Sequence, residues 1–311
     1  MHVVVASHYR LPVKGYGGTE RVVVALVSGL AALGHRVTLL AAPGTHLRDA
    51  TVVEVPPSRI RDPLLDLATL LPPGADILHA VFPVRRAPSH PFVQTLEGNL
   101  QPGSAVPPNN ICVSRNHAQR HGGSDVFVYN GLDPADFVFR PTKADYDLFL
   151  GRLHSIKGYR WALAGAKRSG RRLLVGGGWR PSFRRNIRFV GEVDGTKKAE
   201  LLAGARCLWM PALWEEPFGL TLIEALFSGT PVLATRRGAL PEVITPEVGA
   251  LCDTLDEMIA AAETIHTRDP HACRARAERY FTHLAMAEEY VRMYRALLDT
   301  GNLPPGRPTA G

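Results

Sequence analysis

The stretch EEPFGLTLIEALFSGTPVLA, residues 215–234, is the most informative part of this chain for its fold. Its apolar run Leu220–Phe227 has the length of a buried helix, Gly229 suits the position after a helix end, and PVLA resumes a strand pattern. Two carboxylates, Glu216 and Glu224, fall in the loop before this helix and about one turn inside it. A helix start presents unpaired N–H groups and the positive end of the helix dipole, so this segment is suited to an anionic ligand.

The N–H groups at this helix start belong to Phe218, Gly219 and Leu220, with Thr221 next in the chain. Carboxylates beside them can accept hydrogen bonds from the neighbouring hydroxyls of a ribose or a hexose. The alternative is a helix cap with one additional exposed glutamate, which is the commoner outcome for two glutamates at this spacing.

This stretch resembles the E-x7-E signature of the retaining, family-four glycosyltransferases (glycosyl transferases group 1) of GT-B fold. The resemblance includes Pro217-Phe218-Gly219 and the later sequence GALPEV, residues 238–243. It implies that Glu216 contacts a donor sugar and that Glu224 holds the ribose hydroxyls. The backbone of residues 218–221 would then meet the sugar and its phosphate.

Strand-like and helix-like patterns alternate along the chain, which is typical of parallel sheets covered by helices. The first series of strand patterns covers 2–6, 36–42, 51–55, 76–80, 92–96, 110–114 and 125–129, with a helix at 20–33. The pattern lapses over 133–146. A second series covers 147–151, 172–176, 187–190, 206–210, 231–235 and 249–252.

This alternation, together with the resemblance, predicts an α/β protein of GT-B fold, with two Rossmann-like domains facing each other across a cleft. Residues 1–140 are expected to form the acceptor-side domain and residues 141–284 the nucleotide-sugar domain. Helical patterns follow at 255–266, where Thr254 and Glu257 can form a capping box, and at 272–298. Residues 285–300 are expected to pack back on the first domain, and the Pro- and Gly-rich residues 301–311 to be disordered.

A glycine-rich loop, GYGGTE at residues 15–20, separates the first strand from the first helix. The loop is longer than the tight turn of a dinucleotide fingerprint, and the second strand ends without an acid for an adenosine ribose, which disfavours an oxidoreductase. Glycines let a backbone approach a ligand closely, and Thr19 is placed to cap the helix. The resemblance assigns Gly17 and Gly18 to the donor diphosphate or the acceptor; a loop without a ligand is the alternative.

The sequence GRLHSIKG, residues 151–158, follows the first strand of the second series, where ligands of open α/β sheets bind. Arg152 supplies a bidentate fork and Lys157 a point charge, which together can neutralise a diphosphate leaving group; ordinary surface charge is the alternative. The segment resembles the family's G-R-L-x-x-x-K-G motif, which implies that Arg152 and Lys157 bind the diphosphate. By the same resemblance, Val193 lies in the loop that covers the nucleobase, while His154 is expected to be an exposed residue.

Glu97 marks a departure from the family. Many members have a histidine followed by glycine after the strand that corresponds to 92–96, whereas this chain has Glu97-Gly98. A carboxylate there can accept a hydrogen bond from a sugar hydroxyl, act as a base for the acceptor, or favour an amino or otherwise altered sugar; alternatively, transfer is weak or absent. The nearby His79, His90 and His117 are expected to be structural or surface residues.

The expected chemistry needs no metal and no cofactor, because a nucleoside-diphosphate sugar is a substrate that carries its own leaving group. The D-x-D sequence at 145–147 precedes a strand, away from the ligand edge, so a structural role is expected for it. No nucleophile is evident for the opposite face of the sugar. This is compatible with front-face attack, and the resemblance implies retention of configuration.

The sequence therefore predicts a retaining glycosyltransferase that moves a hexose-type sugar to a hydroxyl acceptor. A UDP-sugar is the favoured donor and GDP-mannose the next. Two alternatives remain open: a sugar-nucleotide epimerase of the same fold, and a non-catalytic sugar-nucleotide-binding protein.

Charge and composition bear on partners and location. The net charge is +7, and residues 152–188 contain eleven Lys and Arg residues and no acid. This segment either forms a solvated face and phosphate ligands or attracts an anionic membrane or acceptor; nucleic acid is disfavoured, because its aromatics lack a stacking pattern. The longest nearly uncharged run, 22–34, is too short for a membrane span, and no signal peptide is evident. The four cysteines form no C-x-x-C pair, so neither a zinc site nor a disulfide framework is expected. A cytoplasmic protein is expected, and peripheral contact with the inner membrane face is left open as an alternative.

Overall fold

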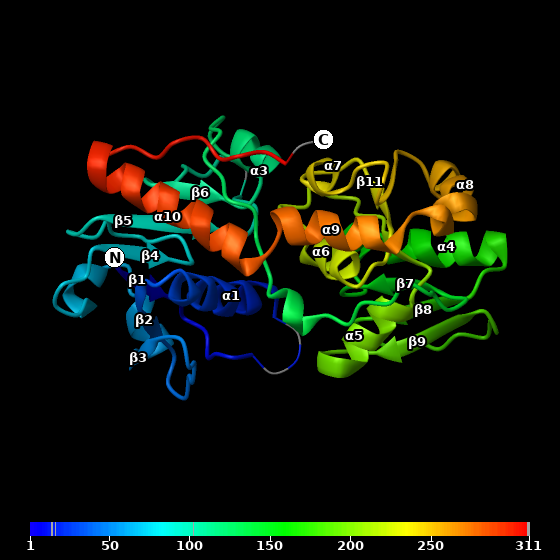
Figure 1. Ribbon diagram of the computed structural model, residues 1–311, viewed down its shortest axis with the longest axis horizontal. Coiled ribbons are helices and arrows are strands. Elements are labelled where there is room, and N and C mark those ends of the chain that lie inside the picture. The colour runs from blue at the N-terminus through cyan, green and yellow to red at the C-terminus, as the bar shows by residue number, and fades with distance from the viewer. Residues whose placement is uncertain (14, 16, 102, 310–311) are drawn as a thin grey trace. The chain divides into compact units, whose positions relative to one another are not determined.

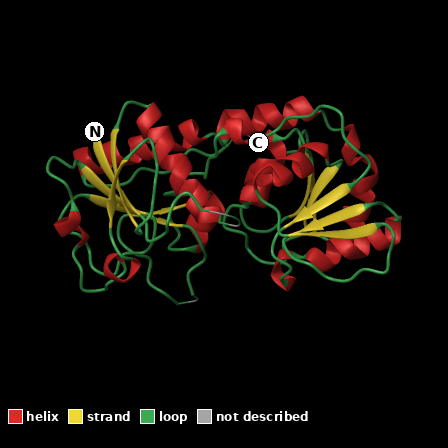
Figure 2. Ribbon diagram, turned by 90° about the horizontal axis from the view of Figure 1, so that it is seen from below, coloured by secondary structure: helices red, strands yellow, loops and turns green. Residues whose placement is uncertain are grey.

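The computed structural model describes residues 1–13, 15, 17–101 and 103–309. They form two compact units, which we call unit 1 and unit 2. Unit 1 consists of Met1–Asp133 and Thr282–Pro308, and unit 2 of Pro134–Phe281 with Thr309. In each unit a parallel sheet is covered by helices (Figures 1 and 2).

Unit 1 is built on a six-stranded sheet of order β3-β2-β1-β4-β5-β6 in which every pairing is parallel. Its strands are β1 His2–Ala6, β2 Arg36–Ala41, β3 Thr51–Glu54, β4 Ile77–Ala80, β5 Phe92–Leu96 and β6 Asn110–Cys112. Its helices are α1 Gly18–Ala32, α2 Pro57–Ile60, α3 Arg115–Arg120 and α10 His283–Thr300, with a 3₁₀ turn η1 at Leu67–Leu70.

Unit 2 repeats this order, with β12-β11-β10-β7-β8-β9, again all parallel. Its strands are β7 Asp147–Leu150, β8 Leu173–Gly176, β9 Ile187–Gly191, β10 Cys207–Met210, β11 Val232–Thr235 and β12 Gly249–Cys252. Its helices are α4 Tyr159–Ser169, α5 Gly195–Gly204, α6 Leu220–Phe227, α7 Leu240–Val243, α8 Leu255–Thr264 and α9 Pro270–Tyr280, with 3₁₀ turns η2 Pro134–Asp136, η3 Ser155–Lys157 and η4 Ile265–Thr267. In both sheets the strand order reverses beside the unit's first strand, as in a Rossmann fold.

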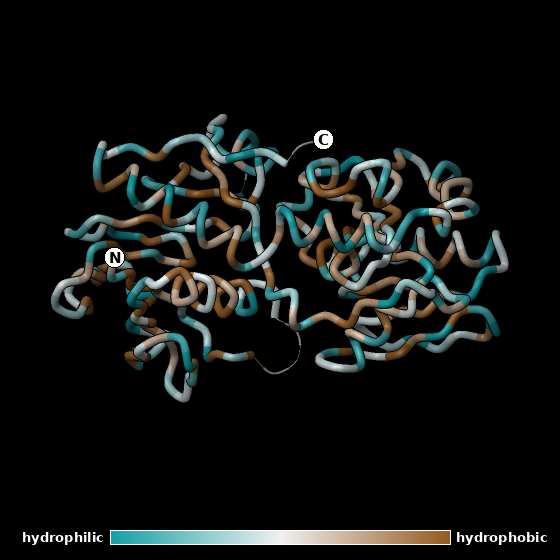
Figure 3. The backbone as a smooth tube through the Cα atoms, viewed as in Figure 1, coloured by the Kyte–Doolittle hydropathy of each residue, from teal (hydrophilic) through white to brown (hydrophobic). Residues whose placement is uncertain are grey.

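The central strands read as continuous apolar runs because helices cover both faces of the sheets (Figure 3). All five residues of β1 and all four of β10 are buried. In unit 2 the core packs Phe149 and Trp209 from adjacent strands against residues of α4 and α8, including Tyr159 and Met258. Each unit thus has an apolar interior of its own.

Helix α10 belongs to unit 1 and packs against α1 (Figure 1). The two helices approach so closely that a Cβ on Gly29 would lie 2.5 Å from the carbonyl oxygen of His283. Thr282 caps α10 by accepting a hydrogen bond from the N–H of Ala285, and Gly301, with φ +75°, ends it.

Three local expectations differ from the structure. Gly17 is the N-cap of α1 and Thr19 lies inside the helix, so Thr19 is not the cap. Residues 125–129 do not form a strand and make only one bridge, between Phe127 and Cys112. In the capping box of α8, Thr254 accepts from the N–H of Glu257, but the Glu257 carboxylate accepts from the N–H of Asp253 and not from that of Thr254.

The segment 301–309 has defined contacts, although the sequence predicts disorder there. The N–H of Gly306 donates to the carbonyl of Asp125 over 2.7 Å, and Arg292 donates to that of Pro305. A Cβ on Gly306 would lie 2.2 Å from the Phe127 carbonyl oxygen, so the tail lies directly against residues 125–127. Thr309 donates to the carbonyl of Glu242 in unit 2. Within the described residues, no helix has the length and apolar character needed to cross a membrane.

Candidate functional site

In unit 2, two loops meet where the strand order of the sheet reverses. Strands β7 and β10 are adjacent and parallel, so the loops that leave their C-terminal ends start side by side. The first loop carries Arg152 and Lys157, and the second leads to Glu216 and α6. The N–H of Leu213 joins the loops by donating to the carbonyl of Ile156 over 2.8 Å. Crevices at this place in open α/β sheets are the usual binding sites for ligands.

Gly158 allows the two loops to approach each other. Its φ is +71°, and a Cβ at this position would lie 1.7 Å from the carbonyl oxygen of Pro211. Any other residue would therefore both strain the backbone and collide with the end of β10. This explains why glycine follows Lys157.

Lys157 and Glu216 form an ion pair between the two loops. The Nζ of Lys157 donates to the Oε2 of Glu216 over 2.7 Å, and the Nε1 of Trp214 donates to the same oxygen over 2.8 Å. The ammonium also lies 4.7 Å from the centre of the Trp214 ring. Glu216 is only 8% exposed, so its charge is held by a cation, an indole N–H and little water.

Glu224 has a different cation as its partner. The Nζ of Lys198 on α5 donates to the Oε1 of Glu224 over 2.8 Å, and Glu224 is 3% exposed. Sequence reasoning missed Lys198, because its partner lies in a different helix, and it missed Trp214 as well. The only signal for Trp214 is that it precedes Glu215-Glu216 in the chain.

The backbone between the two glutamates begins helix α6. Gly219 is its N-cap with φ +88° and ψ +64°, and α6 covers Leu220–Phe227 as the sequence predicts. Phe218 is buried and packs edge-to-face on Phe281, whereas Leu220 and Thr221 are half-buried.

The loop after β11 holds the backbone of Glu216 in place by hydrogen bonds. The N–H of Ala239 donates to the Glu216 carbonyl over 2.9 Å, and the N–H of Gly238 donates to the Glu215 carboxylate over 2.8 Å. A Cβ on Gly238 would lie 2.2 Å from the Glu216 carbonyl oxygen. The GALPEV sequence is thus coupled to the E-x7-E segment by direct contact.

Glycines line the neighbouring strand ends. The N–H of Gly151 donates to the Gly176 carbonyl, and the N–H of Gly177 donates to that of Gly191. A Cβ on Gly177 would lie 2.1 Å from the Gly151 carbonyl oxygen. Val193 comes within 3.2 Å of the place that a Cβ on Gly176 would take, so this predicted nucleobase residue does lie at the same edge of the sheet.

Arg152 and His154 are exposed in the loop after β7. The Nδ1 of His154 accepts from the N–H of Ile156 and caps the 3₁₀ turn η3, which is a structural role for this residue. Asp147 also has a structural role. Its carboxylate accepts two hydrogen bonds from the Arg206 guanidinium, at 2.8 and 2.9 Å, and a third from the Trp209 indole, all of them buried.

The remaining predicted residues belong to unit 1. Gly17 and Gly18 form the start of α1, and a Cβ on Gly17 would lie 2.9 Å from the Glu20 carboxylate. Glu97 follows β5, and its Oε2 accepts a hydrogen bond from the Nδ2 of Asn130 over 3.2 Å. Burial raises the pKa of Glu97 to about 7, although the Asn130 hydrogen bond lowers it. Within the described structure, the inaccessible Oε1 of Glu97 has no hydrogen-bond partner.

The histidines near Glu97 have mostly structural roles. His79 is buried between the hydroxyls of Tyr294, at 2.6 Å, and Thr95, at 2.7 Å, and burial lowers its pKa to about 3. His117 is buried with its Nε2 3.2 Å from the Gly98 carbonyl oxygen. His79 thus ties α10 to β4 and β5, and His117 fixes the loop that holds Glu97.

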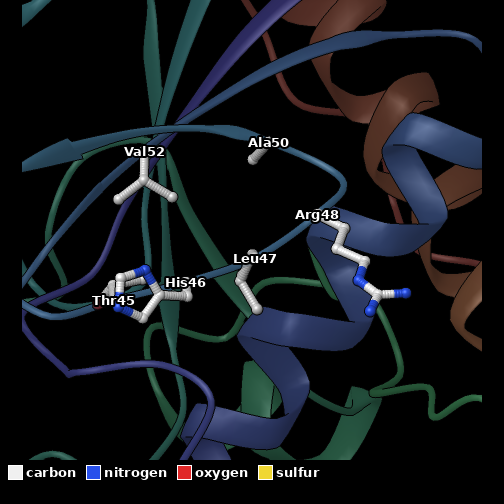
Figure 4. Close-up of a pocket in the computed structure, with 6 residues that line it drawn as sticks. All are labelled: Thr45, His46, Leu47, Arg48, Ala50 and Val52. Atoms are coloured by element: carbon white, nitrogen blue, oxygen red, sulfur yellow. The ribbon is translucent and has the colours of Figure 1, made fainter.

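Two further unit 1 features were not predicted. The ring of His8, just after β1, lies 5.5 Å from that of Phe82, just after β4, at the point where this sheet also reverses its strand order. A shallow hollow near β3, shown in Figure 4, contains none of the predicted site residues. It is lined by Thr45, His46, Leu47, Arg48, Ala50 and Val52.

Comparison with known proteins gives a consistent result. Residues 145–268 match the family described as glycosyl transferases group 1. The chain is 32% identical over 209 residues to a phosphatidyl-myo-inositol mannosyltransferase of Mycolicibacterium smegmatis, covering 58% of this chain and 54% of that protein. It is 33% identical over 172 residues to a glycogen synthase of Mycobacterium tuberculosis, covering 48% and 41%. The chain thus spans about half the length of these curated relatives.

Similarity to solved structures extends over nearly the whole chain. AviGT4, a glycosyltransferase involved in avilamycin A biosynthesis, superposes with a TM-score of 0.79 at 28% identity over 97% of this chain and 99% of its own. Anabaena HepE in complex with UDP shares the fold, with a TM-score of 0.70 at 15% identity over 96% of this chain and all of its own. Residues 145–268 are therefore similar to the glycosyl transferases group 1 family, and the two six-stranded parallel sheets with their helices form the GT-B fold.

Proposed function

We propose that this protein transfers a hexose-type sugar from a nucleoside-diphosphate sugar to a hydroxyl acceptor, with retention of configuration. The observation that carries the proposal is the contact of Lys157 with Glu216 at the reversal point of the unit 2 sheet. Glu224, one turn into α6, completes the set. Cations, carboxylates and a helix N-terminus there match the phosphates and hydroxyls of such a donor.

The ion pairs define how a donor would enter this site. Lys157 turns from Glu216 to the diphosphate, where it and Arg152 stabilise the charge of the leaving group. Glu216 is then available to a sugar hydroxyl. Glu224 accepts from the ribose hydroxyls while Lys198 keeps its charge compensated.

The proposed transfer is a front-face reaction. The acceptor oxygen forms its bond to the anomeric carbon on the face from which the diphosphate departs, and the acceptor proton passes to the diphosphate. The bond between the anomeric carbon and the phosphate oxygen breaks with its electron pair on the diphosphate. No metal or cofactor takes part in this scheme. Glu97 would act in it as a hydrogen-bond partner of a sugar hydroxyl or as a base for the acceptor.

The donor is a UDP-sugar or GDP-mannose. GDP-mannose is supported by relatives named as mannosyltransferases, including a GDP-mannose-dependent α-(1-6)-phosphatidylinositol dimannoside mannosyltransferase of Mycobacterium tuberculosis, 41% identical over 95 residues. Those residues cover only 30% of this chain, so both donors belong in the test.

Calorimetric titration with UDP-, GDP-, ADP- and TDP-sugars tests the donor class. At least one of the UDP- or GDP-sugars is expected to bind, and the same donor should be slowly hydrolysed without an acceptor. Binding without hydrolysis or transfer would favour a sugar-nucleotide-binding protein, and an epimerised donor would favour an epimerase. If none of these donors binds, the proposal is wrong.

A further inference from the structure

The acid-free segment 152–188 contains basic side chains of two kinds. Some have partners within unit 2: Arg168 pairs with Asp256 and Arg171 with Glu263. Others, Arg184, Arg185 and Arg188, form no ion pair with any described residue. Arg184, Arg185 and Arg188 lie within five residues of one another, so they make a local excess of positive charge at the end of the segment.

These arginines lie in and just after the connection between β8 and β9, residues 177–186, which we call the β8–β9 loop (Figure 1). Adjacent parallel strands are usually joined by a crossover helix. Here the ten residues form no helix. The loop therefore has no amphipathic helix that would bury its apolar side chains against the sheet.

Both ends of this loop are held on unit 2. The guanidinium of Arg180 lies 5.3 Å from the centre of the Tyr159 ring, at the start of α4. At the other end, the Nδ2 of Asn186 donates to the carbonyls of Ala166 and Arg171, over 2.8 and 2.9 Å. Residues 181–185, between these two contacts, are all exposed.

Two large aromatic side chains of the loop are left in the solvent. Trp179 is 71% exposed and Phe183 is fully exposed, so neither contributes to the core of unit 2. Arg184 and Arg185 follow Phe183 directly. Aromatic side chains beside arginines are suited to the interface of a bilayer, where apolar rings enter and guanidinium groups meet phosphates.

We propose that the β8–β9 loop is a contact site for an anionic lipid membrane. Trp179 and Phe183 enter the headgroup region, and Arg184, Arg185 and Arg188 bind the lipid phosphates. The inference goes beyond the proposed function and does not depend on it. Single-stranded RNA is the less suitable partner, because a binding surface for bases needs aromatic rings on a shared platform, whereas these two lie four positions apart on an irregular loop.

Flotation of the full chain with lipid vesicles tests this proposal. The protein is expected to float with vesicles that contain phosphatidylcholine and phosphatidylglycerol, and much less with phosphatidylcholine alone. Added salt should weaken binding, because the charges act near the surface. Lipids brominated near the headgroup should quench tryptophan fluorescence, and Trp179→Phe should bind equally well but lose most of this quenching.

Matched variants separate the two contributions. The double variant Trp179→Ser/Phe183→Ser should lower binding at all salt concentrations, with Leu64→Ser as control, because Leu64 is 78% exposed but lies in unit 1. Arg184→Glu/Arg185→Glu should lower binding more than about tenfold, since each basic residue near such a surface contributes about fivefold. Its control is Arg48→Glu/Arg85→Glu, which changes net charge equally at two exposed positions of unit 1.

Circular dichroism of each variant excludes unfolding as the cause. The proposal is overturned if the wild type does not float with anionic vesicles, or if the loop variants float as well as their controls. It is also overturned if fluorescently labelled single-stranded RNA binds in a loop-dependent manner while anionic vesicles do not.

Discussion

Two buried glutamates of the same helix region are held by two separate lysines. Glu216 is bound by Lys157 and Trp214, and Glu224 by Lys198. Neither glutamate simply caps α6, because the N-cap is Gly219 and it has no side-chain cap. The alternative of a helix cap with one additional exposed glutamate is therefore wrong, because both carboxylates are buried.

This difference predicts different effects of removing each carboxylate. Glu224→Ala should weaken binding of the nucleoside diphosphate about 10- to 100-fold, the loss expected for hydrogen bonds to a charged group. Glu216→Ala should leave nucleotide binding within a few-fold and mainly lower kcat for transfer. Calorimetry with the nucleotide and steady-state kinetics distinguish the two, with the exposed Glu263→Ala as control. Equal and negligible effects of both substitutions would contradict the assigned roles.

The burial of Glu97 should make the stability of the protein depend on pH. The pKa of Glu97 is about 7 in the folded protein, against 4.5 in an open chain, so the folded state holds this proton more tightly. Below about pH 4.5 the carboxyl is protonated in both states and does not change the free energy of unfolding. As the pH rises through about 7, ionising the buried carboxyl progressively lowers the free energy of unfolding. Glu97→Gln should therefore gain stability over the wild type as the pH rises through this window, by at most about 3 kcal/mol.

Urea unfolding at about pH 5 and about pH 8 measures this gain. The exposed Glu288→Gln on α10 serves as control and should show no such trend. A constant difference between Glu97→Gln and wild type at both pH values would show that Glu97 is solvated.

At the scale of elements, helix α4 is bounded by two glycines with nearly the same backbone. Gly158 has φ +71° and Gly170 has φ +72°. They differ in their surroundings, because a Cβ at 158 meets the Pro211 carbonyl at 1.7 Å, whereas nothing lies within 4 Å of one at 170. Substituting alanine at both glycines therefore distinguishes the cost of backbone strain alone from the cost of strain plus a steric clash.

Gly170→Ala should cost about 1–2 kcal/mol, the strain of a left-handed residue alone. Gly158→Ala should cost more and should weaken donor binding by at least about tenfold, because the loop of Lys157 must move away from β10. Urea unfolding and nucleotide titration of both variants provide the comparison. Similar losses of donor binding in both variants would mean that the contact at Pro211 does not position Lys157.

The elements also show what sequence can predict. The bounds of α6 follow from the apolar run 220–227 between two glycines, and the central strands follow from runs buried on both faces. Residues 125–129 have the composition of a strand but form only one bridge, beside Cys112 of β6, and the tail bonds to Asp125 through Gly306. Lys198 could not be assigned, since only the packing of α5 beside α6 brings it to Glu224. In both cases the outcome depends on contacts between segments far apart in the sequence, which local sequence patterns do not reveal.

At the scale of the whole molecule, the two units divide the predicted site residues between them. Arg152, Lys157, Glu216 and Glu224 belong to Pro134–Phe281, which has its own sheet and core. A fragment of residues 134–281 should therefore bind the nucleoside diphosphate with a Kd within about tenfold of the full chain. It should have no transferase activity, because Glu97 and the Gly17-Gly18 loop are absent.

Calorimetry of this fragment, with its Glu224→Ala variant as control, provides the measurement. A fragment that is folded by circular dichroism but does not bind nucleotide would show that unit 2 alone does not hold the donor.

Retaining transfer from a nucleoside-diphosphate sugar can be followed through the anomeric configuration of the product. The most direct test follows the full chain by proton NMR with the donor that binds best among UDP-α-glucose, GDP-α-mannose and related α-linked sugars, and records the first sugar product. We expect the α-anomer to appear first, as free sugar or in the acceptor linkage, and Glu216→Ala to slow its appearance. A β-anomer as the first product, or a donor that remains intact or is only epimerised, would contradict retaining transfer.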